Sequence, residues 1–308
     1  MYPAYLAGPL YVLKLTGLDT RWAVLVQPYV THCLLVLLGD LFLWHGAKRY
    51  VGQNGARIAM LLTLVNRSQT EFITRCFTNG VEQVLSVIAF YFYLGQKERF
   101  TFHTVVLTAT ITLSFMMRNT SPIGWIPLLA IKVLFEGAFL PFLLAGVFVA
   151  VPIIGLVVAI DTFYYLGAVD GQNWVLTSYN FMKLNVVEGL SEFFGTDPAW
   201  FYLLVFMPAI FTVMYPAVLV SLFTHFKTMQ AKNLSPYLTY YNAFYLAVFS
   251  AIPHKELRFL IPVVPFAFVM TGELLAQMLK KGSCMASFAI KLFVLVEICS
   301  IAVITLFH

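Results

Sequence analysis

The residues with the clearest potential for chemistry lie in the stretch Pro253–Phe259, which reads PHKELRF. It places His254, Lys255, Glu256 and Arg258 between two long apolar segments. Arginine offers a bidentate fork to a phosphate, lysine a mobile point charge, and histidine a further hydrogen bond or a proton. The glutamate among them is better suited to orient its basic neighbours than to attack a substrate. The stretch indicates either a phosphate site or an interfacial loop whose Lys and Arg reach lipid headgroups.

The elements that must position this stretch are membrane helices. Of the 308 residues, 60% are hydrophobic and 11% charged, against roughly 25% charged in soluble domains. A helix needs about 20 apolar residues to cross a bilayer, and several runs approach that length: Trp22–Trp44, Pro141–Ile160, Phe201–Phe223, Phe259–Leu279 and Cys284–Phe307. Shorter runs occur at Ala56–Val65, Val81–Leu94, Thr104–Met117, Ile123–Phe135 and Tyr237–Ile252. The sequence predicts an all-α, polytopic membrane protein with roughly ten transmembrane or membrane-embedded helices.

The charge and the cysteines exclude some classes of function. The net charge is +5, but the basic residues are scattered through short loops, which is not the pattern of a nucleic-acid-binding face. The four cysteines have no metal-ligand or redox spacing and are expected to be apolar packing residues: Cys33, Cys76, Cys284 and Cys299. We therefore expect no nucleic-acid partner, no metal and no disulfide.

Basic residues in short loops predict the orientation of the chain, because such loops stay cytoplasmic. The residues that mark this face are Lys48, Arg49, Arg57, Lys97, Arg99, Lys227, Lys232, Lys280 and Lys281. Alternating spans then place four polar segments on the opposite face: 66–79, 118–121, 161–200 and 254–258. Every polar segment that could contribute to a functional site is thus predicted to be non-cytoplasmic.

The segment Asp161–Trp200 is predicted to be the largest loop, at roughly forty residues, long enough for structure of its own. Its many aromatic side chains would either anchor helices at the headgroup level or stack on sugar rings. The chain shows no internal repeat and no linker. We therefore predict one membrane domain over residues 1–308.

Other polar residues on the same predicted face are candidates for a shared site. Arg75 and Arg118 would form a cationic phosphate site with Lys255 and Arg258 if the four converged on one cavity. Glu71 and Glu82 fit either catalysis or pairing with Arg67, Arg75 or other neighbours at helical spacing. Asp161 is expected to begin the large loop.

Two further features of the sequence suggest structure or modification rather than catalysis. Asn66-Arg67-Ser68 and Asn119-Thr120-Ser121 match the N-glycosylation sequon but lie near predicted helix ends. Lys291 and Glu297 lie inside the last apolar run and are predicted to form an internal or snorkelling pair.

The polar segments, taken together, resemble a known family. Residues 253–262 (PHKELRFLIP) closely resemble the HKExRF signature of the mannosyltransferases of glycosyltransferase family 22, and residues 74–82 (TRCFTNGVE) resemble the family's TRTxTNxxE stretch. Arg118-Asn119-Thr120-Ser121, followed by 125–129 (WIPLL), is similar to its RPTxxxxWxPL stretch, and Asp161 stands where the family has D-x-x-x-Y-G. The resemblance implies a fold of the GT-C type with one larger luminal loop.

Within that family, the chain is most similar to the branch that adds the third, α-1,2-linked mannose of the glycosylphosphatidylinositol (GPI) precursor. Residues 180–185 (NFMKLN) and 262–266 (PVVPF) resemble that branch, whereas Leu257 and the stretch 199–202 (AWFY) depart from it. The match begins after the family's first span and first luminal loop, which carry the acidic residue taken to be the catalytic base. The resemblance therefore predicts a chain that is N-terminally incomplete relative to the family, with Glu71, Glu82 and Asp161 as substitute candidates.

The resemblance implies transfer of mannose from dolichyl-phosphate-mannose to a lipid-linked glycan in the endoplasmic reticulum membrane, with inversion and a luminal active site. The resemblance implies no cofactor and no obligate protein partner for this reaction. His254, Lys255, Arg258, Arg118 and Arg75 would bind the donor phosphate, and Glu256 would orient them. The alternatives are a dolichol-linked-oligosaccharide mannosyltransferase of the same family (α-1,6 or α-1,2), a non-catalytic membrane scaffold or a transporter.

Overall fold

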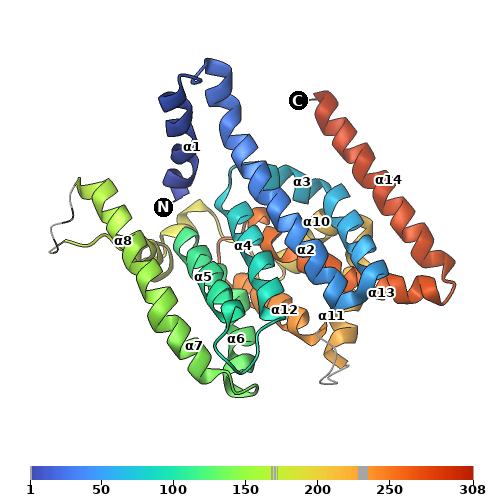
Figure 1. Ribbon diagram of the computed structural model, residues 1–308. Helices are drawn as coiled ribbons and strands as arrows, with labels where there is room; N and C mark the ends of the chain where they lie inside the picture. The colour runs from blue at the N-terminus through green and yellow to red at the C-terminus, as the bar shows by residue number, and fades with distance from the viewer. Residues whose placement is uncertain (1, 168, 170, 172, 228–234, 308) are drawn as a thin grey trace. The chain divides into compact units, whose positions relative to one another are not determined.

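The computed structural model describes residues 2–167, 169, 171, 173–227 and 235–307, and this part of the chain contains helices and connections but no strand (Figure 1). The all-α prediction is confirmed there. Lys232, predicted to mark the cytoplasmic face, lies outside the described residues, as do Ala168, Asp170 and Gln172 of the large loop.

Five helical stretches are long and apolar enough to cross a membrane, and they coincide with the long apolar runs of the sequence. They are α2 (Arg21–Val65), Phe139–Leu166, Tyr202–Thr224, Leu257–Lys280 and α14 (Cys284–Phe307). The second consists of α7 (Phe139–Ala145), the π-helical turn η2 (Gly146–Ala150) and α8 (Val151–Leu166). The third consists of η5 (Tyr202–Phe206), α10 (Met207–Phe211), η6 (Thr212–Met214) and α11 (Tyr215–Lys227), and the fourth of η7 (Leu257–Val263) and α13 (Val264–Lys280).

The shorter apolar runs are also helical. They form α4 (Thr78–Tyr93), α5 (Phe102–Met117), η1 with α6 (Ser121–Gly124 and Trp125–Leu134) and α12 (Ser235–Ala251). The predicted separate run Ala56–Val65 is instead the end of α2, which continues through Lys48 and Arg49 and kinks at Gly52 (φ 76°, ψ 175°). Glycine permits this kink because it adopts positive φ without a steric penalty.

The described chain divides into two compact units, the first comprising Met1–Gly39 and Thr74–Phe194. It contains α1 (Tyr2–Thr16), and its centre is the pair α4 and α5, which lie side by side in Figure 1. Tyr93 and Trp125 are buried against each other, and the Tyr93 hydroxyl donates to the carbonyl of Leu128 (3.2 Å). Aromatic packing and one buried hydrogen bond thus attach α6 to the helix pair.

The second unit comprises Asp40–Ile73 and Gly195–His308, and its central element is α13. Of the apolar stretch in the span Leu257–Lys280, 78% is buried, against 11% in α14, so protein surrounds α13. Gly272 on α13 meets Gly55 and Ala59 of α2, whose backbones approach closely because the facing residues are small. The short α3 (Arg67–Thr74) follows α2. The prediction of a single domain stays a prediction.

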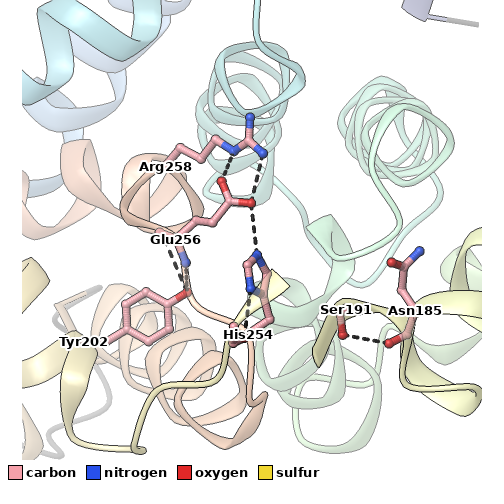
Figure 2. Close-up of polar contacts among 7 residues, drawn as sticks. Asn185, Ser191, Tyr202, His254, Glu256 and Arg258 are labelled. Carbon is pink, nitrogen blue, oxygen red and sulfur yellow. Dashed lines mark hydrogen bonds and ion pairs between the residues drawn. The ribbon is translucent and has the colours of Figure 1, made fainter. Parts of the chain in front are cut away.

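The large loop begins later than the sequence predicts. The helix α8 runs past Asp161 to Leu166 and ends at Gly167, whose φ of 75° is the left-handed conformation typical of a helix end. Beyond it lie α9 (Thr177–Met182), the π-helical turn η3 (Lys183–Val187) and the 3₁₀ turn η4 (Leu190–Phe194). Ser191 donates to the carbonyl of Asn185 (2.9 Å), which closes the turn between η3 and η4 (Figure 2). The loop therefore has its own helical structure.

We expect Gly272→Ala to lower the free energy of unfolding by about 1–3 kcal/mol, because the added methyl group overpacks a close helix contact. A Cβ at Gly272 would lie 2.5 Å from the carbonyl oxygen of Gly55 and 2.9 Å from the nitrogen of Ala59. The measurement is the thermal unfolding midpoint of the purified protein in detergent. Gly155→Ala on α8 is the matched control, since nothing lies within 4 Å of its Cβ position. Equal midpoints for both variants would contradict the close-packing interpretation.

Candidate functional site

The predicted signature stretch connects α12 to η7 in the second unit. Helix α12 ends at Ala251, and Glu256 is extended (φ −134°, ψ 144°) immediately before η7 begins. Pro253 cannot donate a backbone hydrogen bond, which favours an interruption of helical structure there. The side chains of His254, Glu256 and Arg258 meet one another within this short connection (Figure 2).

Glu256 is the centre of this polar cluster. Its Oε1 accepts from Nη2 of Arg258 (2.9 Å), and its Oε2 forms an ion pair with Nε of the same guanidinium. Nε2 of His254 lies 3.2 Å from Oε1 of Glu256, while Nδ1 lies 3.2 Å from the carbonyl oxygen of Gly195. Both partners of His254 are acceptors, so the doubly protonated imidazolium satisfies both.

The environment of Glu256 favours its charged form. Desolvation is the largest single influence and raises its pKa, but the hydrogen bonds and charges of Arg258 and His254 together lower the pKa below its usual value. The stability gained is present above the ordinary carboxyl pKa and is lost as the pH falls through the lowered value. At neutral pH the cluster therefore contains a carboxylate between two basic groups.

Lys255 points into the protein. It is 5% exposed, and its Nζ donates to the carbonyls of Ile252 (2.6 Å) and Asp197 (3.1 Å). Nζ also lies 5.8 Å from the centre of the Tyr202 ring, and the backbone N–H of Asp197 donates to the carbonyl of Pro253 (3.0 Å). Burial lowers the pKa of Lys255, opposed by the nearby Asp197. Lys255 thus attaches the segment around Asp197 to the end of α12.

Tyr202 binds the backbone of Glu256. Tyr202 is fully buried, and its hydroxyl accepts from the N–H of Glu256 (3.2 Å) and donates to the carbonyl of Glu256 (3.3 Å). In the sequence, Tyr202 stood out only within a departure from the related branch, so its role was missed. A tyrosine inside an apolar run is a weak signal, because its partner is decided by packing.

A ladder of aromatic rings supports the same connection from α12. The rings of Tyr245 and Phe249 are stacked with centroids 4.5 Å apart, and Phe249 lies 5.7 Å from Phe259. The Tyr245 hydroxyl donates to the carbonyl of Phe259 (3.1 Å), and the His254 ring lies at 6.2 Å from the Phe259 ring. The signature stretch is therefore held on both sides by buried aromatic residues.

Arg118 and Glu82, predicted as a phosphate ligand and a candidate base, pair with each other in the first unit. Nε of Arg118 lies 3.0 Å from Oε2 of Glu82, which is 0% exposed, and it also donates to Thr120 (2.9 Å). The structural alternative for Glu82 was pairing with a neighbour at helical spacing. Its partner Arg118 comes from the end of α5 instead, because the packing of α4 on α5 brings the two together.

The two remaining candidates, Glu71 and Arg75, belong to different units. Glu71 is half-buried on α3 in the second unit, and Arg75 is exposed between α3 and α4 in the first unit. Lys255 and Arg258 belong to the second unit, so the convergence of the four cations on one cavity stays a prediction.

Asp161 was predicted to open the loop, and that prediction is wrong. It is buried inside α8, where its Oδ2 accepts from the Thr177 hydroxyl (2.7 Å). The neighbouring Thr162 hydroxyl accepts from the N–H of Val175 (3.0 Å). Asp161 and Thr162 thus tie the start of α9 back to α8.

The predicted pair between Lys291 and Glu297 is also wrong. Lys291 is exposed, whereas Glu297 is buried and accepts from Arg67 and Thr212. Six positions along a helix do not bring two residues to the same face, which explains the difference.

The two sequons have contacts that compete with a glycan. Asn66 is fully buried, and its Nδ2 donates to the carbonyl of Ile210 (2.7 Å). Nδ2 of Asn119 donates to the carbonyl of Ser178 (2.7 Å). The nitrogen atom that a glycan would modify is thus engaged in both sequons.

A metal-dependent site has no support among the described residues. They contain no group of three or more His, Cys, Asp or Glu side chains that could hold a metal ion. The expected absence of a cofactor stays a prediction.

Comparison with known proteins identifies the family. A sequence profile of the Alg9-like mannosyltransferase family, Glyco_transf_22, matches residues 1–308. The chain belongs to this family. The predicted membership of glycosyltransferase family 22 is thereby confirmed over the whole chain.

Several curated proteins are similar to the chain over most of its length. The bovine GPI alpha-1,2-mannosyltransferase 3 (Bos taurus) is 30% identical over 275 residues, covering 88% of the chain and 48% of the relative. GPI mannosyltransferase 3 of Yarrowia lipolytica is 29% identical and covers 89% and 51%, and the human GPI alpha-1,2-mannosyltransferase 3 (Homo sapiens) is 28% identical and covers 90% and 48%. The chain thus spans about half the length of the curated relatives it matches.

The fold of this family member is similar to that of a solved membrane glycosyltransferase. ArnT from Cupriavidus metallidurans, whose crystal structure is bound to undecaprenyl phosphate, superposes with a TM-score of 0.57 at 13% identity. The match covers 85% of the chain and 47% of ArnT. The predicted all-α, GT-C type of fold is therefore confirmed.

We expect Tyr202→Phe to lower the free energy of unfolding by about 1–3 kcal/mol, because the N–H and carbonyl of Glu256 lose the same partner. The measurement is thermal unfolding in detergent. Tyr215→Phe is the control, since its hydroxyl makes one exposed bond, to the carbonyl of Leu203 (2.7 Å). If Tyr215→Phe destabilises as much as Tyr202→Phe, the hydroxyl of Tyr202 has no special role.

We expect neither Asn66 nor Asn119 to carry a glycan. The measurement is the electrophoretic mobility of the chain from a eukaryotic microsomal expression before and after endoglycosidase treatment. No shift is expected, because the burial of Asn66 and the bond of Asn119 to Ser178 keep the oligosaccharide from the amide nitrogen. A shift that disappears in Asn66→Gln or Asn119→Gln would contradict this expectation at that position.

Proposed function

We propose that the chain transfers mannose from dolichyl-phosphate-mannose to a lipid-linked glycan in the endoplasmic reticulum membrane. The acceptor that its relatives point to is the GPI precursor that receives its third mannose in α-1,2 linkage. The observation that carries the proposal is the Alg9-like family match over residues 1–308, together with curated relatives named GPI alpha-1,2-mannosyltransferase 3 in several vertebrates.

The polar cluster suits the leaving-group half of this reaction. As the glycosidic bond to phosphate breaks, negative charge moves onto the dolichyl phosphate, and preorganised cations stabilise it. Lys255 and Arg258 each bring one positive charge, and the Glu256 carboxylate offsets one of them. The cluster is therefore cationic with neutral His254 and more so with its imidazolium form.

The three basic residues have different places in this proposal. The Arg258 side chain is 39% exposed and that of His254 is 18% exposed, whereas Lys255 is buried on backbone carbonyls. Arg258 and His254 are the groups that can reach a phosphate in this conformation. Lys255 contributes its field and holds the segment around Asp197.

The acceptor half needs a carboxylate to take the proton of the attacking hydroxyl. Glu82 is buried on Arg118, and Asp161 is buried on Thr177, so neither side chain is accessible. Glu71 is half-buried and shares the second unit with the cluster. We therefore retain Glu71 as the candidate base, on the luminal face predicted for the site.

Mannose transfer in microsomes tests the proposal. With dolichyl-phosphate-mannose and a GPI precursor as substrates, we expect Arg258→Ala to lower kcat on the order of 100- to 1000-fold without loss of folded protein. Arg258→Lys should lie in between, because it keeps the charge and loses the fork. Lys183→Ala is the control, a basic residue of the same predicted face with an exposed side chain.

Lys255→Met should lower both transfer and thermal stability, because two backbone carbonyls lose their donor. A wild-type chain that transfers no mannose, or an Arg258→Ala chain with full activity, would refute the proposed function. Transfer to a dolichol-linked oligosaccharide but not to the GPI precursor would instead select the neighbouring branch of the family.

A further inference from the structure

A further buried carboxylate, outside the signature stretch, lies on the last helix of the chain. Glu297 is on α14, an apolar helix long enough to cross a membrane, yet it is 1% exposed. A carboxylate inside an apolar span is costly unless it is paired or used. The proposed reaction assigns it no part, so its contacts need a separate explanation.

The partners of Glu297 come from two other elements of the second unit, and each of them donates to it. Oε2 accepts from the backbone N–H of Arg67 (2.7 Å), and Oε1 accepts from the Thr212 hydroxyl (2.8 Å) and, at 3.5 Å, from Nδ2 of Asn66. The carboxylate is therefore used as an acceptor on both oxygen atoms. It has no ion pair with a lysine or arginine side chain in the part of the chain that the structure describes.

The first partner is the beginning of α3. Arg67 is the first residue of that helix, where N–H groups have no acceptor within the helix. Asn66 caps the same end, because its Oδ1 accepts from the N–H of Gln69 (2.8 Å). A carboxylate there also complements the positive end of the helix dipole. Glu297 and Asn66 together fix where α3 starts and how it is anchored.

The second partner is a break in the span Tyr202–Thr224. Thr212 has φ 45° and ψ −126°, and it is the one residue other than glycine with positive φ in the described part of the chain. For a β-branched residue this conformation costs about 1–3 kcal/mol and persists only where its surroundings impose it. The hydrogen bond to Glu297 holds the Thr212 side chain.

These two elements carry residues of the proposed site. The helix α3 contains Glu71, the candidate base, and the broken span begins at Tyr202, which holds the backbone of Glu256. We propose that Glu297 is a positioning residue that sets α3 against the broken span and thereby aligns Glu71 with the basic cluster. Its effect on turnover rests on the proposed function, whereas its effect on α3 does not.

Two measurements test this role. One is mannose transfer, resolved into kcat and KM, and the other is deuterium exchange of the Arg67–Thr74 segment in the purified protein. Glu297→Gln is expected to lower kcat on the order of 10- to 100-fold with KM within about twofold, because the reacting groups are misplaced while the substrates still bind. It should also raise exchange in α3. Glu297→Asp should recover part of both losses.

Thr212 supplies a matched pair of variants. Thr212→Val removes the hydroxyl at nearly constant shape, and Thr212→Ser keeps it, so we expect Val to behave like Glu297→Gln and Ser like the wild type. The double variant Glu297→Gln with Thr212→Val should have no lower kcat than Glu297→Gln alone, since both substitutions disrupt the same hydrogen bond between Thr212 and Glu297. Lys291→Met, an exposed position of α14, should change nothing.

The outcomes are separable. Full kcat and unchanged exchange for Glu297→Gln would overturn the inference, as would equal losses for Thr212→Val and Thr212→Ser. Lower abundance with an unchanged kcat per folded molecule would also overturn it, because it would mean a purely structural carboxylate. If the wild type transfers no mannose, the proposed function fails, and the exchange of α3 still decides whether Glu297 anchors that helix.

Discussion

The structure depends on one constraint, that a charge beside or inside an apolar span needs a partner. The described chain meets it in different ways. Glu82 takes the guanidinium of Arg118, Glu256 takes Arg258 and His254, and Lys255 donates to backbone carbonyls. Glu297 accepts from a helix N-terminus and a threonine hydroxyl. Because hydrocarbon provides little hydrophobic force between helices, such directional contacts carry much of the positioning within each unit.

The signature stretch shows how this constraint divides one short sequence between structure and chemistry. Lys255 points inward and holds the segment around Asp197, while the neighbouring Arg258 remains partly exposed. A charged residue in such a stretch therefore has a role that depends on its direction as well as its type. Support for the exposed groups comes from Tyr202 and from the stacked rings of α12, all of them buried.

Irregular backbone in the apolar spans is found where side chains can compensate for it. The span that begins at Tyr202 changes from π-helical to α-helical to 3₁₀ conformation around Thr212, whose hydroxyl bonds Glu297. Non-helical backbone at membrane depth is tolerated where protein covers it and satisfies its polar groups. The hydrogen bond from Thr212 to Glu297 therefore joins the break in the helix and the buried carboxylate in one arrangement.

The sequence by itself determined the helices and the composition of the signature stretch. Apolar runs such as Phe259–Leu279 are long enough that only a helix can bury their backbone groups in hydrocarbon, and the order of polar segments indicated the family. Tertiary structure alone decided the partners. Asp161 became part of α8, Glu82 paired with Arg118 and Glu297 turned to α3 rather than to Lys291. Helical periodicity specifies which residues share a face, but the contacts of that face depend on which helix packs against it, and packing joins residues that are far apart in the chain.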